Sequence, residues 1–291
     1  MLITILSIVQ HIEFFHNDHF QNDYFRKKPK KSLNDYIDFY WETDFEELFH
    51  LYPEGFSDAL FPNIGYTYLI NLGTPYVMQL EEKRFNMKSD GFLPRNKNMI
   101  CHHSAGNKLF GIKFKVSPVL FQKKINFSEY REFIFPLSYL IDKTVLVKIK
   151  SLQNFYDRVA FLNNYYEKLI SNTTHEINRI RVVTECIRYY SEKGNFDLTI
   201  TELADKNNIS SKSLQRYFME ATSISGKKAL QIIRIRHAIE HLTKSPSTFN
   251  VADFGYYDYS HFYKHLKLFV GSHMLVALKP HLYNHQALIH H

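Results

Sequence analysis

Four polar residues between Ser210 and Phe218 have the types and spacing of side chains that contact DNA: Lys212, Ser213, Gln215 and Arg216. An Arg can donate two parallel hydrogen bonds to guanine, and a Gln can pair in the same way with adenine, in a major groove that admits one α-helix. An ordinary solvated helix face would carry the same residue types. Taken alone, these four residues leave both interpretations open.

Sixteen histidines raise the question of a metal site. Two pairs are four residues apart, His237 with His241 and His261 with His265, and this spacing places both rings of a pair on one helix face. Neither pair has an Asp, Glu or Cys at a helical spacing that obviously completes a tetrahedral set. We therefore predict no metal site and no cofactor. The closing histidines are interpreted as a frayed terminus, with an adventitious metal-binding tail as the alternative; they are His281, His285, His290 and His291.

Catalytic patterns are weak. Cys101-His102-His103 places a thiol beside imidazoles, but neighbouring residues on a strand point to opposite faces of the sheet. The sequence holds no Gly-rich phosphate loop, nucleophile elbow or zincin motif. We therefore predict that the chain is not an enzyme.

Length and charge suggest two domains, one of them suited to a polyanion. A chain of 291 residues with 45% hydrophobic content is typical of about two folded domains. Residues 178–291 hold 15 Lys and Arg against 9 Asp and Glu, a net charge of +6, whereas residues 1–177 hold 21 against 20. The two cysteines cannot form a disulfide framework, and no apolar run approaches membrane length. We expect a cytoplasmic protein without a membrane partner, and we interpret the apolar residues 1–9 as a buried strand.

The spacing of apolar residues in the sequence changes near residue 150. Before it, short apolar runs are separated by Gly and Pro, as in β-rich domains. In one such run Ile112 and Phe114 alternate with Lys113 and Lys115, which predicts a half-buried strand with solvated lysines. From Ser151 onward, apolar residues recur at intervals of three and four, which predicts an amphipathic helix. That helix could pack on its own domain or form a dimer seam.

A helix, a tight turn and a second helix are predicted between Thr199 and Phe218. Thr199 and Glu202 have the spacing of a capping box, so a helix should start there. Asn208 tolerates a left-handed backbone in the turn, and Ser210 can cap the next helix. This order of elements is a helix-turn-helix unit, and it would place the four polar residues on the outer face of its second helix.

A second unit follows a long helix that opens at Ser225. Gly255 suits a turn with positive φ, and Asp258 can cap the final helix. Phe262, Leu266 and Phe269 form the buried side of that helix.

These residues resemble the AraC/XylS family of bacterial transcription regulators. The matching features are Leu203-Ala204, Ser210, Leu214-Gln215-Arg216, Phe218, Arg234, Ala238, Gly255-Tyr-Tyr-Asp258, Ser260-His-Phe262, Lys264, Lys267 and Gly271. The resemblance implies a C-terminal double helix-turn-helix domain that contacts DNA from Lys212, Gln215 and Arg216 in the first unit and from Tyr259, Ser260, His261 and Lys264 in the second. Asn250, Val251 and Ser272-His273 depart from the family pattern, which puts the second unit in doubt as a DNA reader.

The N-terminal half more weakly resembles the β-rich sensor domain of some such regulators, through Tyr40-Trp41, Pro53-Glu-Gly55 and Phe110-Gly-Ile-Lys-Phe114. We therefore predict an α+β protein with a β-rich regulatory domain at 1–148, a linker helix at 149–176, a DNA-binding domain at 177–275 and a tail at 276–291. The resemblance implies double-stranded DNA as partner, with RNA polymerase, a small-molecule effector and a second copy of the chain as further candidates. The alternative is a small-molecule or metal sensor whose DNA-binding domain is degraded.

Overall fold

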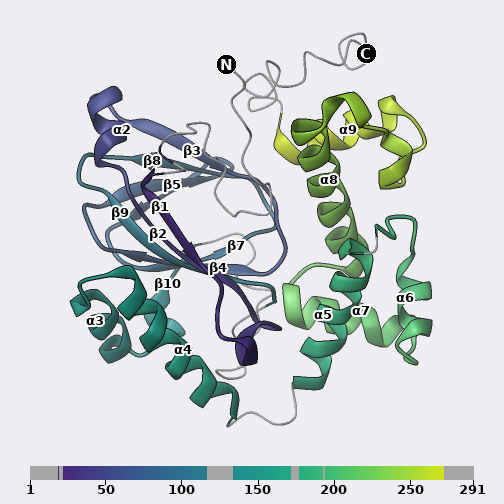
Figure 1. Cartoon of the computed structure of the whole chain (residues 1–291), viewed down its shortest axis with the longest axis horizontal. Coiled ribbons are helices and arrows are strands. Elements are labelled where there is room, and N and C mark those ends of the chain that lie inside the picture. The colour runs from purple at the N-terminus through teal and green to yellow at the C-terminus, as the bar shows by residue number, and fades with distance from the viewer. Residues whose placement is uncertain (1–18, 20–21, 117–133, 172–176, 193, 272–291) are drawn as a thin grey trace.

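The computed structural model describes residues 19, 22–116, 134–171, 177–192 and 194–271, and it has an α+β fold (Figure 1). The predictions for residues 1–9 and for the histidine tail lie outside these residues. One antiparallel sheet has the strand order β1 (Tyr24–Lys27), β2 (Ile37–Asp44), β9 (Lys108–Phe114), β4 (Tyr66–Asn71), β7 (Gly91–Pro94) and β10 (Phe135–Pro136). The second has the order β3 (Phe56–Leu60), β8 (Met99–His103), β5 (Tyr76–Leu80) and β6 (Lys83–Met87).

Alternation along the strands builds a core between the two sheets. Trp41, Leu69 and Leu109 from the larger sheet share one buried cluster with Met78 and Cys101 from the smaller. Cys101 and His103 are buried on one face of β8, whereas the intervening His102 is half-exposed on the other. The thiol and the neighbouring imidazole therefore point apart, as the strand period predicts.

Helices cover the outer face of the larger sheet. The short helix α2 (Glu46–Leu51) lies within the β-rich part, and α3 (Lys143–Ser151) and α4 (Phe155–Ser171) follow it. The buried residues of α4, Val159, Leu162 and Tyr166, join a core cluster that includes Tyr40 and Phe114 of the sheet. The amphipathic stripe of α4 therefore packs on its own domain.

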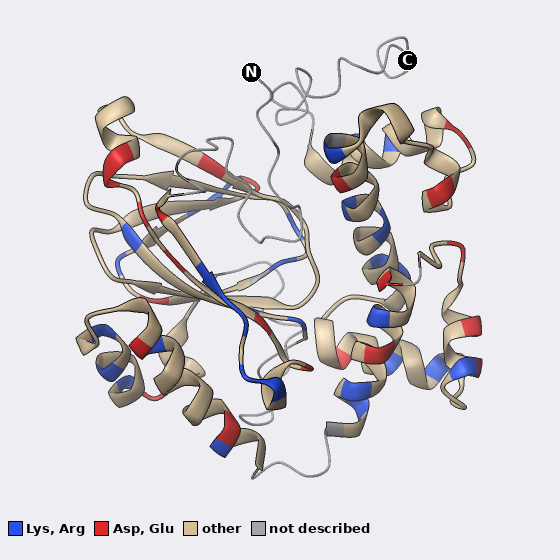
Figure 2. Cartoon of the chain, in the orientation of Figure 1, with Lys and Arg blue, Asp and Glu red and all other residues tan. Residues whose placement is uncertain are grey.

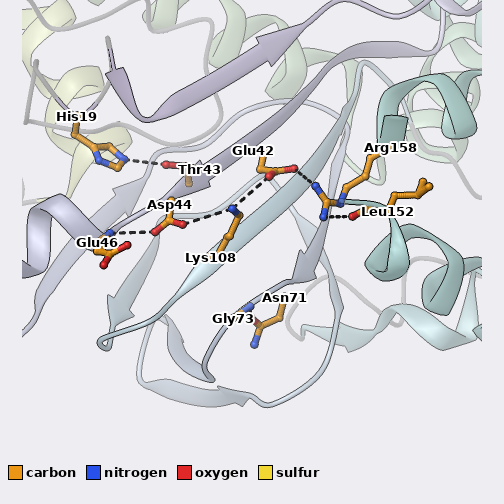
Figure 3. Close-up of polar contacts among 10 residues, drawn as sticks. All are labelled: His19, Glu42, Thr43, Asp44, Glu46, Asn71, Gly73, Lys108, Leu152 and Arg158. Carbon is orange, nitrogen blue, oxygen red and sulfur yellow. Dashed lines mark hydrogen bonds and ion pairs between the residues drawn. The ribbon is translucent and has the colours of Figure 1, made fainter. Parts of the chain in front are cut away.

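A buried ion pair fixes α4 to β2 (Figure 3). Arg158 Nη1 lies 2.8 Å from Glu42 Oε2, and both side chains are 6% exposed. Arg158 also donates to the carbonyls of Ile149 and Leu152 at the end of α3. Lys108 bridges Glu42 and Asp44 at 3.7 and 3.5 Å. The guanidinium thus joins α3, α4 and the sheet at one point.

The prediction of solvated lysines on β9 is wrong at Lys113. This side chain is 2% exposed, and its ammonium donates to the carbonyls of Ile64 and Phe114. The register between β2 and β9 shifts between Ile37 and Phe39, opposite the end of β9, and residues of α5 and α8 line the same cavity as Lys113. A strand that alternates apolar and basic residues is half-buried only where one of its faces meets water. At Lys113, which is 2% exposed, the polar face of the strand does not meet water.

The C-terminal part consists of helices and tight turns. They are α5 (Ile177–Glu192), α6 (Ile200–Lys206), α7 (Ser211–Thr222), α8 (Gly226–Lys244), the 3₁₀ turns Pro246–Thr248 and Val251–Phe254, and α9 (Tyr259–Val270). Figure 1 shows α8 running through the middle of this part, with α7 near one end and α9 near the other. No helix among the described residues is long and apolar enough to cross a membrane.

Candidate DNA-binding surface

The first helix-turn-helix unit forms as the sequence predicts. Thr199 and Glu202 complete the capping box of α6, with the Thr199 amide donating to Glu202 Oε2 at 2.7 Å. Asn208 has a φ of 53°, the left-handed backbone of the turn. The Ser210 hydroxyl accepts from the Ser213 amide at 3.1 Å and starts α7. Three local features of the sequence therefore fix where both helices of this unit begin.

The exposed face of α7 carries two cations. Leu214 and Phe218 are fully buried, which turns Lys212 and Arg216 outward to solvent. Among the described residues Arg216 forms one ion pair, a long one with 3.8 Å between its Nε and Glu220 Oε1. An exposed contact at this distance contributes little and leaves the guanidinium available to another partner.

The other two predicted contacts on α7 are already engaged inside the protein. Gln215 Oε1 accepts from the amide of Gly226 at 3.1 Å and so ties α7 to the start of α8. Ser213 Oγ accepts from Ser210 Oγ at 3.0 Å. Gln215 therefore positions the start of α8 through its side-chain oxygen.

The second unit keeps its turn but not a regular first helix. Gly255 has a φ of 66°, and the Asp258 carboxylate accepts from the His261 amide at 2.7 Å to start α9. The element before the turn is the four-residue 3₁₀ turn that begins at Val251. It lies at Asn250 and Val251, where the sequence departs from the family pattern, and it is a 3₁₀ turn rather than an α-helix.

The residues predicted on the outer face of α9 differ in how exposed they are. His261 and Lys264 are exposed, whereas Tyr259 and Ser260 are half-buried. The Tyr259 ring packs against Phe249 at a centroid distance of 6.4 Å. Lys264 forms no ion pair with any residue that the structure describes. Two of the four residues predicted for this unit are therefore exposed, and one of them, His261, also packs edge-on against the Tyr256 ring at a centroid distance of 5.2 Å.

Arg234 on α8 holds the second unit in place, a role that the sequence did not indicate. Its Nη1 donates to the carbonyl of Gly255 at 3.1 Å, and its guanidinium lies 4.5 Å from the centre of the Tyr256 ring. The residue was identified only through its match to the family. A cation that contacts the backbone of a tight turn 21 residues away cannot be located from local spacing.

The paired histidines are engaged in packing. His265 Nδ1 lies 2.6 Å from the Tyr256 hydroxyl, and burial, with the nearby Arg234 and Lys228, lowers the pKa of His265 to about 4. Burial also lowers the pKa of His237. Both rings are thus held neutral near pH 7. No group of three or more possible metal ligands occurs within the described residues.

Substituting Ala for Gly255 is expected to destabilise the protein by more than the same change at Gly194. Both glycines have positive φ, 66° and 62°, which costs an Ala about 1 kcal/mol. A Cβ at Gly255 would also lie 3.0 Å from the carbonyl oxygen of Phe196, whereas nothing lies within 4 Å of one at Gly194. Urea unfolding of both variants separates packing from backbone strain. Equal losses would mean that the turn does not need this close approach.

The N-terminal domain contacts the C-terminal ends of both exposed helices. The Tyr66 hydroxyl donates to Ser223 Oγ, in the residue that ends α7. Asn98 donates to the carbonyl of Phe269 in the last turn of α9, at 2.8 Å. Between them, Arg236 of α8 donates to the carbonyl of Pro62 at 2.9 Å. The β-rich domain therefore contacts both α7 and α9 at their C-terminal ends.

Lys and Arg side chains of the C-terminal part lie along α8 and on the helices of the first unit. Figure 2 shows Lys and Arg at successive positions along α8 and on the helices of the first unit. Lys227 and Lys228, next to the Ser225 cap of α8, are exposed. The positive charge counted in the sequence therefore lies partly on surface close to α7.

Comparison with models of known families and with curated protein sequences gives no match. Among solved structures, the chain is similar to ToxT from Vibrio cholerae, with a TM-score of 0.43, 9% sequence identity and coverage of 85% of this chain and 95% of the other. For ToxT of strain SCE256 with a bound unsaturated fatty acid, the TM-score is 0.41 and the sequence identity 12%, with coverage of 74% of this chain and 87% of the other. For the AraC-like transcriptional activator CuxR, the TM-score is 0.29 and the sequence identity 10%, with coverage of 77% of this chain and 89% of the other.

Proposed function

We propose that this chain is a sequence-specific transcription regulator that binds double-stranded DNA through α7 and α9. The observation that carries the proposal is the pair of exposed helix faces, with Lys212 and Arg216 on one and His261 and Lys264 on the other. Each face belongs to a capped helix that follows a tight turn. Two such faces on one rigid domain suit two segments of major groove.

The connecting helix supports this geometry. At 1.5 Å per residue, the 19 residues of α8 span about 28 Å. Successive major-groove segments on one side of B-DNA are about 34 Å apart. A rigid spacer of this length is suited to holding two recognition helices in neighbouring turns of the same groove.

The two units would contribute unequally. In the first, a regular α6 supports α7, whose cations point outward. In the second, a 3₁₀ turn replaces the supporting helix, and Tyr259 packs inward. We infer that α7 supplies most base reading, and that α9 supplies orientation and affinity for the backbone.

Affinity for DNA should fall log-linearly with salt concentration, because each phosphate neutralised by a cation releases condensed counterions. The expected slope is about 0.9 per contact, so Lys212, Arg216 and Lys264 alone would give a slope of about 2.7 if each met a phosphate. Fluorescence anisotropy with a labelled duplex over a range of salt concentrations measures it. A flat response would contradict binding through phosphate contacts and favour the alternative, a small-molecule or metal sensor whose helical domain is degraded.

The N-terminal domain would act as the regulatory part. Its contacts to Ser223 and Phe269 reach both recognition helices, so a change in how the two domains dock would act on both helices at once. A small-molecule effector is the partner that this arrangement suits. RNA polymerase and a second copy of the chain stay predictions from the family resemblance.

A further inference from the structure

Three side chains form a hydrogen-bonded row across the outer face of the smaller sheet. They are Ser57 on β3, His102 on β8 and Gln79 on β5, and β8 lies between the other two strands. Ser57 Oγ lies 2.8 Å from His102 Nδ1, and His102 Nε2 lies 3.2 Å from Gln79 Oε1. His102 alternates with the buried Cys101 and His103, so its ring is on the face of β8 that the core does not occupy. A hydroxyl, an imidazole and a hydrogen-bond acceptor in this order are the parts of an activated serine nucleophile.

The hydrogen bonds fix which nitrogen of His102 carries the proton. The side-chain nitrogen of Gln79 donates to the carbonyl of Glu81 at 2.9 Å, which turns the side-chain oxygen of Gln79 toward His102. That oxygen can only accept a hydrogen bond, so the proton is on His102 Nε2 and Nδ1 keeps its lone pair. Burial, and then the nearby Arg84, lowers the pKa of His102. The ring is therefore neutral near pH 7, and Nδ1 accepts the hydrogen bond that the Ser57 hydroxyl donates.

The exposed Ser57 lines a groove of about 810 Å³, whose other lining residues come from the smaller sheet, α8 and α9. Pockets that hold small molecules measure roughly 300–1,000 Å³. Apolar surface in the groove includes Ile100 of β8 and Leu268 of α9. From α8 come Lys228 and Gln231, whose N–H groups can stabilise negative charge on a carbonyl oxygen. The groove therefore offers a small ester room beside the Ser57 hydroxyl, apolar surface for its carbon chain and donors for its oxygen.

We propose that Ser57 is a reactive nucleophile that accepts an acyl group from a small ester. In this step a bond forms between Ser57 Oγ and the carbonyl carbon, and the bond from that carbon to the leaving oxygen breaks. The hydroxyl proton passes to His102 Nδ1 and from there to the departing oxygen, which leaves as an alcohol. Gln79 positions the ring by accepting from its Nε2–H, and it stabilises the imidazolium that forms. This covalent chemistry is independent of the proposed function, because it requires no DNA.

Incubation of the full chain with p-nitrophenyl butyrate tests the proposal, followed by mass spectrometry of the intact protein and of its peptides. We expect one butyryl group per chain, located on Ser57, with release of the same amount of nitrophenol. Ser57→Ala should lose this adduct, and His102→Gln should slow labelling about 100-fold, because the general base is lost. Ser171→Ala is the matched control and should label like the wild type. Ser171 is also exposed, but its hydroxyl donates to the carbonyl of Lys168 on α4.

Two variants of Gln79 separate positioning of the imidazole from a structural role. Gln79→Leu and Gln79→Glu both lose the hydrogen bond to the Glu81 carbonyl, but only the second keeps an oxygen that accepts from His102 Nε2–H. We expect Gln79→Leu to label more slowly than the wild type and Gln79→Glu to recover most of the rate. Butyryl groups on lysines only, labelling of Ser57 no faster than that of Ser171, or an unchanged rate in His102→Gln would each overturn the proposal.

Discussion

Replacing Arg158 by Met is expected to lower the free energy of unfolding by about 3–5 kcal/mol, because it leaves the Glu42 carboxylate buried without its main partner. Arg158 Nη1 lies 2.8 Å from Glu42 Oε2, and both side chains are 6% exposed. Removing the guanidinium also removes the hydrogen bonds that it donates to two carbonyls at the end of α3. Lys108, at 3.7 Å from Glu42, is too distant and too exposed to replace it. Urea unfolding followed by circular dichroism measures the loss.

Arg188→Met provides the matched control. Arg188 pairs with Glu185 on α5, but both side chains are about half exposed, so the midpoint of unfolding should not change measurably. Adding Glu42→Leu to Arg158→Met should recover part of the lost stability, since the unpaired charge is removed while the lost contacts of α3 are not. A loss in Arg158→Met no greater than in the control would show that the ion pair does not hold α4 on the sheet.

Features encoded within a few residues were predictable. The capping box at Thr199, the left-handed Asn208, the Ser210 cap, the Gly255 turn and the Asp258 cap all form as predicted. Each depends on backbone and side-chain groups no more than three residues apart, so the physics that fixes it is visible in the sequence itself. The α+β architecture followed from the change in hydrophobic period near residue 150 for the same reason.

Features that depend on distant contacts were not predictable. The strand period placed Lys113 on a solvated face, because nothing nearby in the sequence indicates that α5 and α8 cover the end of β9. The same applies to Gln215, whose amide meets the first residue of α8, and to Asn98, which reaches α9 from 171 residues away. Sequence alone named the residues of the candidate surface but could not tell which of them the fold already uses.

Arg216→Ala is expected to weaken binding to the specific DNA site about 5- to 150-fold, or about 1–3 kcal/mol, if the guanidinium reads a guanine edge. The site is first selected from a random pool with the wild-type protein. Affinity for unrelated duplexes should fall much less, so the preference for the specific site should shrink. The physical reason is that a bidentate contact distinguishes bases, whereas a phosphate contact is the same on every sequence.

Lys264→Ala serves as the comparison, because this side chain is exposed on α9 and forms no ion pair with the described residues. As a phosphate contact, it should weaken binding equally on specific and unrelated DNA and reduce the salt slope by about 1. If Arg216→Ala behaves in the same way, Arg216 is a phosphate contact too, and base reading must lie elsewhere. If Lys264→Ala alone relaxes sequence preference, α9 is the principal reader, and the unequal roles inferred from the 3₁₀ turn before it are reversed.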